Sequence, residues 1–189
     1  MVSHQPIFLL GVLLILGCGG GGSPSSTPPA GSEMAAPPVI EEFSPPPTKP
    51  EVALTAPDEP IPVSQEFQVV LDVHEVHQLY GVALSVRYDP AQLTYIRHLE
   101  GDLLNQDGAP TVTEVAVAED APGEILVGVT RVGEVGGVSG SGTLATLVFE
   151  AREPGRATVQ VAEATATLRD PNDTPLDVSD WPGVVLTIQ

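Results

Sequence analysis

The chain has 189 residues, and 7 Lys and Arg side chains stand against 25 Asp and Glu side chains, so its formal net charge is −18. Such acidity argues against nucleic acid as a partner, because phosphate binding needs Lys and Arg to replace counterions. One cysteine excludes a disulfide framework within the chain, and 20 Pro with 19 Gly argue against a helix-rich architecture.

Residues 1–17 have the features of an export signal. The apolar run Ile7–Leu16 has ten residues, fewer than the roughly 20 that a membrane-spanning helix needs. Gly17 and Cys18 follow it in the pattern of a bacterial lipobox, in which the cysteine receives a lipid and becomes the first mature residue. We therefore expect an exported protein anchored in a bacterial membrane through Cys18. Because Gly19 is not Asp, we expect the outer membrane in a two-membrane cell. A plain secretory signal with an incidental cysteine is the alternative.

Residues 18–50 have the composition of a linker. From Gly19 to Pro50 the segment holds 9 Pro, 5 Gly and 5 Ser, with almost no periodic apolar pattern. Such a segment cannot bury enough apolar surface to offset its chain entropy. We expect it to be disordered and to act as a stalk between the lipid and the folded domain, stiffened by its prolines.

Residues 51–189 have the pattern of one β domain. With 6 Arg and 22 acidic residues, this segment has a formal charge of 6 − 22 = −16. Runs that alternate between apolar and polar residues, separated by turn residues such as Asp-Pro and Pro-Gly, predict strands. The nine predicted strands are Val52–Ala56, Phe67–Val73, Leu79–Tyr88, Leu93–Leu99, Thr111–Ala118, Glu124–Val132, Thr143–Ala151, Thr158–Leu168 and Val184–Ile188. Many short strands at this spacing predict an all-β sandwich or barrel.

Alternation also predicts which side chains face the core. In the third run, Val82, Leu84, Val86 and Tyr88 share the inward face, and Ala83, Ser85 and Arg87 share the outward face. The glycines between Gly133 and Gly142 predict a flexible loop before the strand that begins at Thr143.

Several short motifs occur in the order and spacing of a known module. They are Leu79-Tyr80-Gly81 with Leu84–Pro90, then Gly101-Asp102-Leu103-Leu104, and then Gly140–Phe149. Together they resemble a cohesin module over the whole of residues 51–189. The resemblance implies a nine-stranded jelly-roll β-sandwich, of the kind shared with some carbohydrate-binding modules.

The resemblance also implies a function, because cohesins are receptor domains that hold dockerin-bearing enzymes in cellulosomes. It predicts a non-catalytic module for a dockerin-like or other extracellular protein in polysaccharide degradation. We expect the partner to dock on the face that bears Gly81, Ala83, Ser85 and Arg87. Dockerin-binding cohesins usually carry an Asn and an Asp two residues apart on this face, where the present chain has Gly81 and Ala83. Arg87 is the residue expected to make a strong directional contact, preferably with a carboxylate.

The alternative function is direct binding of polysaccharide. Of the aromatic residues after position 50, Tyr80, Tyr95 and Trp181 are not placed on an inward face by alternation, so they are the possible sugar contacts. The chain contains no arrangement of residues typical of a nucleophilic or metal-dependent enzyme, so we expect neither catalysis nor a cofactor.

Asp170, Asn172 and Asp173 are weak candidates for a calcium site, because hard oxygen ligands gather there. A polar hairpin turn explains the same residues and is the favoured interpretation, so we expect no metal.

Overall fold

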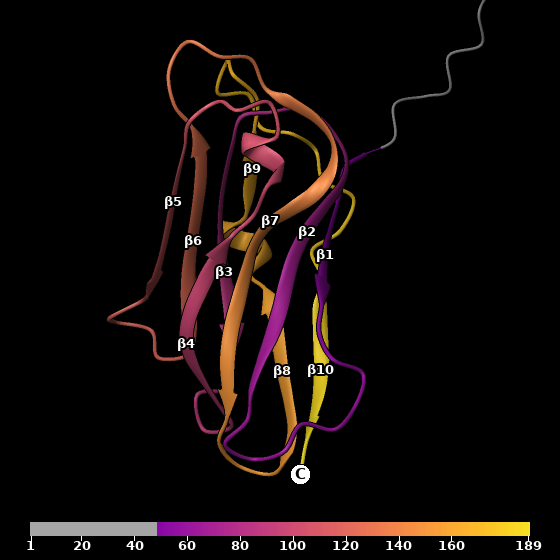
Figure 1. The fold of residues 1–189 in the computed structure, drawn as a ribbon, viewed down its shortest axis with the longest axis vertical. Coiled ribbons are helices and arrows are strands. Elements are labelled where there is room, and N and C mark those ends of the chain that lie inside the picture. Colours follow the sequence, from indigo (N-terminus) through magenta and orange to yellow (C-terminus); the bar gives the residue numbers. More distant parts are fainter. Residues whose placement is uncertain (1–48) are drawn as a thin grey trace, which may run out of the picture. The chain divides into compact units, whose positions relative to one another are not determined.

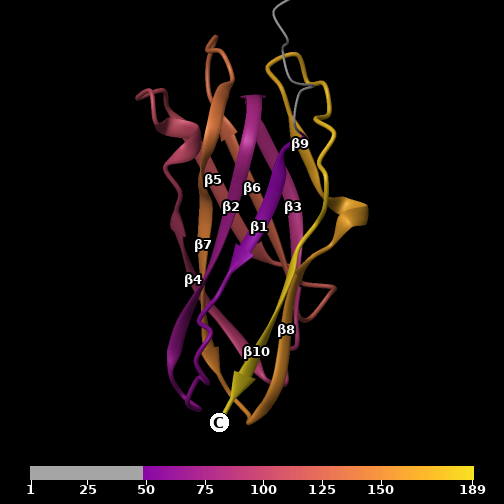
Figure 2. The ribbon, with the colours of Figure 1, turned by 90° about the vertical axis from the view of Figure 1, so that its right-hand side faces the viewer.

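A computed structural model describes residues 49–189, which form two antiparallel β-sheets packed face to face (Figure 1, Figure 2). The expected all-β sandwich is therefore confirmed. The strands are β1 (Glu51–Thr55), β2 (Glu66–Leu79), β3 (Gly81–Tyr88), β4 (Leu93–Glu100), β5 (Thr111–Val117), β6 (Glu124–Arg131), β7 (Val138–Ala151), β8 (Gly155–Val161), β9 (Thr167–Arg169) and β10 (Gly183–Ile188). Two short 3₁₀ helices accompany them, η1 (Leu103–Asn105) and η2 (Glu163–Thr165).

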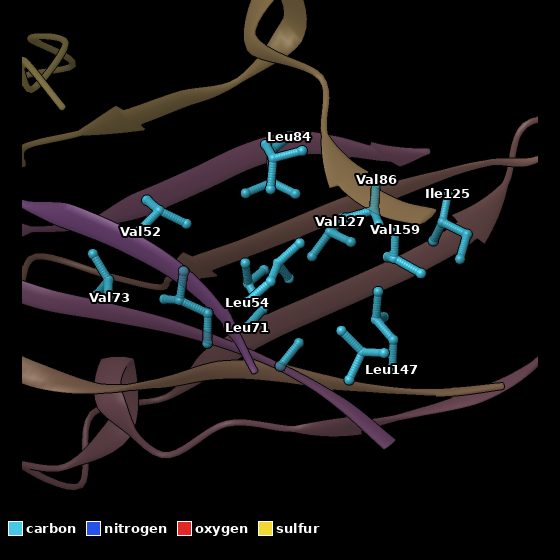
Figure 3. Close-up of a cluster of buried hydrophobic side chains, with 14 of the residues drawn as sticks. Val52, Leu54, Leu71, Val73, Leu84, Val86, Ile125, Val127, Leu147 and Val159 are labelled. Carbon is cyan, nitrogen blue, oxygen red and sulfur yellow. The ribbon is translucent and has the colours of Figure 1, made fainter. Parts of the chain in front are cut away.

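Each layer of the sandwich is one sheet. The four-stranded sheet has the order β1-β2-β7-β4, and the six-stranded sheet has the order β10-β8-β3-β6-β5, with β9 added beside β3. Figure 3 shows Leu71 and Leu147 from the first sheet and Leu84 and Ile125 from the second directed into the same interior. All four side chains are buried, so the core lies between the sheets.

The structure has ten strands where the sequence predicted nine, because the run Thr158–Leu168 is divided. Its first part belongs to β8, which pairs with Val86–Tyr88, and its last part belongs to β9, which pairs with Gly81–Ala83. Both therefore use the same edge of β3. The chain between them leaves the sheet and forms η2.

The strand β2 is longer and less regular than the alternation predicted. Phe67, Val69, Leu71 and Val73 are buried as expected, but the next buried residues follow at intervals of three, Val76 and Leu79. Two bulges in β2 cause the change, since β2 advances by three residues while β7 advances by two, first from Val73 to Val76 and again from Val76 to Leu79. Each extra residue moves out of the ladder, so that an apolar side chain still faces the core.

The bulges of β2 also explain why part of the glycine-rich segment before Thr143 is ordered as a strand. The bulged residues Glu75 and Gln78 have positive φ angles, 53° and 56°. Their backbone N–H groups donate to the hydroxyls of Ser141 and Ser139, each at 3.0 Å. The prediction of a flexible loop up to Gly142 is therefore wrong from Val138 onward, because this part of the segment forms the start of β7.

Phe149 is the centre of an aromatic cluster in the core. Its side chain is fully buried, and its ring lies 5.9 Å from that of Phe67, 5.2 Å from that of Tyr88 and 6.0 Å from that of Tyr95. Tyr88 points inward as expected, but it is only half-buried because it ends its strand. Burial raises the pKa of both tyrosines.

A buried arginine ties the end of β6 to the loop after η1. Arg131 is 2% exposed, and it donates to the backbone carbonyl of Leu104. Its two terminal nitrogens also donate to the Asp107 carboxylate at 3.1 and 2.6 Å, a two-pronged ion pair. This hydrogen bonding to Arg131, with help from the N–H of Ala109, lowers the pKa of Asp107.

The predicted signal of residues 1–17, Cys18 and all but the last two residues of the predicted linker lie outside the described residues. Between residues 49 and 189, no helix is long and apolar enough to cross a membrane.

Truncating Phe149 to Ala should lower the free energy of unfolding by about 3–5 kcal/mol, because the cavity removes contacts with three rings. Urea unfolding followed by circular dichroism measures the change. Val185, which is 56% exposed, is the matched control, and Val185→Ala should change stability by no more than about 0.5 kcal/mol. A loss of less than about 1 kcal/mol for Phe149→Ala would show that the cluster is not central to the core.

Asp107→Asn should reduce the stability of the domain at neutral pH, and the stability of the variant should fall less than that of wild type as the pH is lowered. A carboxylate whose pKa is lower in the folded chain contributes stability above its unfolded pKa, near 3.9, and this contribution disappears as the pH falls through the folded value. Thermal unfolding from about pH 7 to about pH 2 measures the effect. Asp58→Asn is the control, because Asp58 is exposed and makes no hydrogen bond or ion pair within residues 49–189. Parallel pH curves for wild type and Asp107→Asn would contradict the assignment.

Candidate functional site

The outer face of the six-stranded sheet carries the predicted binding residues. On β3, Val82, Leu84 and Val86 are buried in the core, so the alternate residues Gly81, Ala83, Ser85 and Arg87 are directed to the other side of the sheet. Strand β3 lies between β6 on one edge and β8 with β9 on the other. These residues therefore lie in the middle of the face and not at its rim.

The register of the sheet defines what lies beside each of them. On β6, Gly128 is opposite Ala83, Leu126 is opposite Ser85, and Glu124 is opposite Arg87. On β5, the next strand, Glu114 is opposite Gly128 and Ala116 is opposite Leu126. Small residues thus occupy most of the area around Leu126.

A shallow apolar groove of about 520 Å³ follows from this arrangement. Ala83, Gly128 and Leu126 form much of its floor, Ala116 and Glu114 of β5 lie on one side, and Thr165 of η2 lies on the other. Leu126 is 48% exposed although it lies within a sheet. An exposed leucine surrounded by small residues is the surface that a partner helix can cover closely.

Ser85 differs from its expected exposure. Its side chain is directed outward, but the residue is only 1% exposed. The chain that leaves β8 for η2 runs beside it, since the backbone N–H of Ala162 donates to its carbonyl at 2.8 Å. Ser85 lines the groove but leaves little of its own surface open to a partner. Its role is internal, since its hydroxyl hydrogen-bonds the Glu124 carboxylate.

Arg87 is exposed as expected and forms an ion pair across the sheet. Its Nε donates to Glu124 Oε2 at 3.2 Å, and the side chains of Arg87 and Glu124 are 54% and 17% exposed. The Ser85 hydroxyl, and then the Arg87 guanidinium, hold the pKa of Glu124 below its usual value. Glu124 therefore keeps a negative charge beside the groove and holds the Nε side of the Arg87 guanidinium.

A second depression, of about 400 Å³, lies on the other side of Arg87. It is lined by Arg87, Arg156, Thr158 and Gln160, with Asp89 and Tyr88 at the end of β3. Arg156, Thr158 and Gln160 are the outward residues of β8, because Ala157 and Val159 between them are buried. This part of the face is polar, in contrast to the groove.

The possible sugar contacts do not form a platform. Tyr95, for which alternation gave no inward placement, lies on β4 of the four-stranded sheet and packs inward on Phe149. Trp181 lies just before β10 and packs against the core, and the Tyr80 hydroxyl donates to the carbonyl of Gly133. Within residues 49–189, no two of these three rings are in contact.

The weak calcium candidates lie in a hydrogen-bonded turn. The Asp170 carboxylate accepts from the N–H groups of Asn172 and Thr174, each at 2.8 Å, and these bonds lower its pKa, with Thr174 contributing most. Asp173 is directed elsewhere, since its carboxylate accepts from Arg169 at 3.1 Å. The oxygens thus serve the turn that the favoured interpretation predicted.

Sequence reasoning did not single out Leu126, Gly128, Ala116 and Arg156. A signal was present for Leu126, because alternation along Glu124–Val132 places this apolar residue on the outward side with Glu124 and Gly128. The neighbours of β3 could not be read from the sequence, so nothing joined these residues to Ala83 and Arg87.

Comparison with known proteins agrees with this architecture. The family model described as cohesin domain matches residues 50–181. A search of curated proteins finds no match. Among solved structures, a non-cellulosomal cohesin from Archaeoglobus fulgidus is 17% identical with a TM-score of 0.57, and the match covers 75% of this chain and 92% of that one.

Two further structures show the same fold. The cohesin module of a family 33 glycoside hydrolase from Clostridium perfringens is 12% identical with a TM-score of 0.60, covering 75% of this chain and 98% of that one. A type II cohesin–X–dockerin complex from Acetivibrio cellulolyticus is matched at 14% identity with a TM-score of 0.62, covering 75% of this chain and 100% of that one. With a family model matched over most of its length and a sandwich of this topology, the chain belongs to the cohesin domain family.

Proposed function

We propose that this chain is a non-catalytic recognition module that binds a dockerin-like protein on the outer face of its six-stranded sheet. The observation that carries the proposal is the apolar groove around the exposed Leu126, on the face of a cohesin-family domain. Cohesins of similar fold are described in complexes with dockerins, among them the sixth cohesin of Acetivibrio cellulolyticus scaffoldin B.

The groove suits a helix because small residues surround the exposed Leu126. Ala83, Gly128 and Ala116 have little or no side chain, so a helix backbone can approach the sheet while Leu126 packs between its side chains. Polar contacts at positions 81 and 83 are not available from Gly81 and Ala83. The partner is therefore recognised by shape at the groove and by charged groups beside it.

Leu126→Arg should abolish capture of the partner, because it places a charged side chain in the centre of the groove. Loss of a central contact of this kind weakens binding by about thirtyfold or more. The full-length chain, immobilised, is offered dockerin-bearing proteins secreted by the same organism, and captured proteins are identified and their dissociation constants measured.

Leu99→Arg is the matched control for this experiment. Leu99 is 46% exposed, close to the 48% of Leu126, but it lies on β4 of the opposite sheet. Equal loss in both variants, or no loss in either, would contradict docking in the groove. Retention on a polysaccharide gel that is lost in Trp181→Ala would favour the carbohydrate-binding alternative.

We further propose that the module is exported and held at a membrane by lipid on Cys18. The support is the apolar run Ile7–Leu16 followed by Gly17 and Cys18, and the Pro-, Gly- and Ser-rich segment that separates Cys18 from β1. A tethered recognition module would retain its partner at the surface of the cell, where extracellular polysaccharide is degraded.

Cys18→Ser should move the protein from the membrane fraction to the soluble fraction, because lipid attachment needs the thiol. Fractionation with immunoblotting measures the distribution, and mass spectrometry of the wild type detects the acyl chains. Ser23→Ala, a change of similar size in the adjacent segment, is the control and should remain in the membrane fraction. An unlipidated wild type in the soluble fraction would contradict the anchor.

A further inference from the structure

We propose that the depression between Arg87 and Arg156 binds a carboxylate of the protein partner, so that the docking face joins an apolar groove to an anion-recognising site. The inference rests on the proposed function, since it concerns the partner on the same face. It specifies the chemistry of that partner: an acidic side chain placed where its helix crosses β3 and β8.

Arg156 is the arginine that forms no ion pair within the part of the chain that the structure describes. Within residues 49–189, each of the other five arginines has a carboxylate within 4.0 Å. Between residues 51 and 189 there are 22 acidic side chains for 6 arginines, so an arginine without an ion pair in this part of the chain is unexpected. Arg156 is exposed on β8, and a partner's carboxylate would have no internal one to displace there.

The neighbours of Arg156 on the face leave its charge uncompensated. Thr158 and Gln160 are the next outward residues of β8, and Thr187 is opposite Arg156 on β10. The acidic residue that lines the depression is Asp89, whose carboxylate accepts from the N–H of Ala91 at 2.9 Å and lies beyond ion-pair distance of Arg156. Thr158 and Gln160 add uncharged hydrogen-bonding groups to the same depression.

Arg87 can take part without breaking its existing contact. It binds Glu124 through Nε, and its terminal nitrogens make no other hydrogen bond within the described part of the chain. With its side chain 54% exposed, those nitrogens remain available to a second carboxylate. A carboxylate between Arg87 and Arg156 would receive charge-assisted hydrogen bonds from two guanidinium groups, which are stronger than hydrogen bonds between neutral groups.

The charges are also ordered across the sheet. Arg156 on β8 and Arg87 on β3 are followed by Glu124 on β6 and Glu114 on β5. A helix that crosses these strands meets positive charge at one end and negative charge at the other. The face therefore favours one orientation, with the acidic end of the partner helix over β8 and its basic or amino-terminal end over β5.

The test uses two synthetic helical peptides with the same Leu and Ala stripe. One carries two Glu residues at its carboxyl end, and the other carries Gln at the same positions. Titration of the full-length, ¹⁵N-labelled chain is followed by NMR at the Nε–Hε signals of the arginines. The Glu peptide should bind about tenfold more tightly than the Gln peptide and should shift the signals of Arg87 and Arg156.

Arg156→Gln should remove the difference between the two peptides, and Arg152→Gln should retain it. Arg152 is the matched control, because it is also exposed and lies just before β8, but it has Glu150 at 3.9 Å. Equal affinity for the two peptides, or no measurable affinity for either, would overturn the inference. Such a result would leave the proposed function intact if Leu126→Arg still abolished capture of the natural partner. Failure of Leu126→Arg to do so would count against the proposed function itself.

Discussion

The pairing of β3 on both edges is the constraint on which the rest of the outer face of the six-stranded sheet depends. Strand β6 occupies one edge along nearly its whole length, while β8 and β9 share the other. This double pairing keeps Ala83 and Arg87 in the middle of a sheet, where their surroundings are other strands and not loops. It also forces the chain between β8 and β9 out of the sheet as η2, whose Thr165 lines one side of the groove.

The two sheets contribute different things to the module. The four-stranded sheet supplies Phe149, the centre of the aromatic cluster, and the bulged pairing of β2 with β7. Both features stabilise the sandwich. The six-stranded sheet buries its inner face against that core and leaves an outer face rich in small residues. Because rigid backbone hydrogen bonds position that outer face, a partner can bind it with little loss of conformational entropy.

Charge has separate roles within the domain and on its surface. Arg131 and Asp107 form a partly buried pair that fixes a loop, and Ser85 with Arg87 holds Glu124 ionised at the edge of the groove. Elsewhere the strong negative charge keeps acidic partners at a distance. Arg156 and Arg87 interrupt that negative field on one face, and on our proposal they would orient an approaching partner as well as bind it.

The sequence by itself determined that residues 51–189 form a β-sandwich and which residues of most strands face the core, because alternation and turn residues are local properties. It also placed Gly81, Ala83 and Arg87 on one side of β3. Only the tertiary structure decided that Ser85 is buried, that Tyr95 packs inward, and that Leu126 and Arg156 join the same face. Strand order, bulges and the path of η2 depend on contacts between residues that are distant in sequence. Local sequence patterns do not predict such contacts.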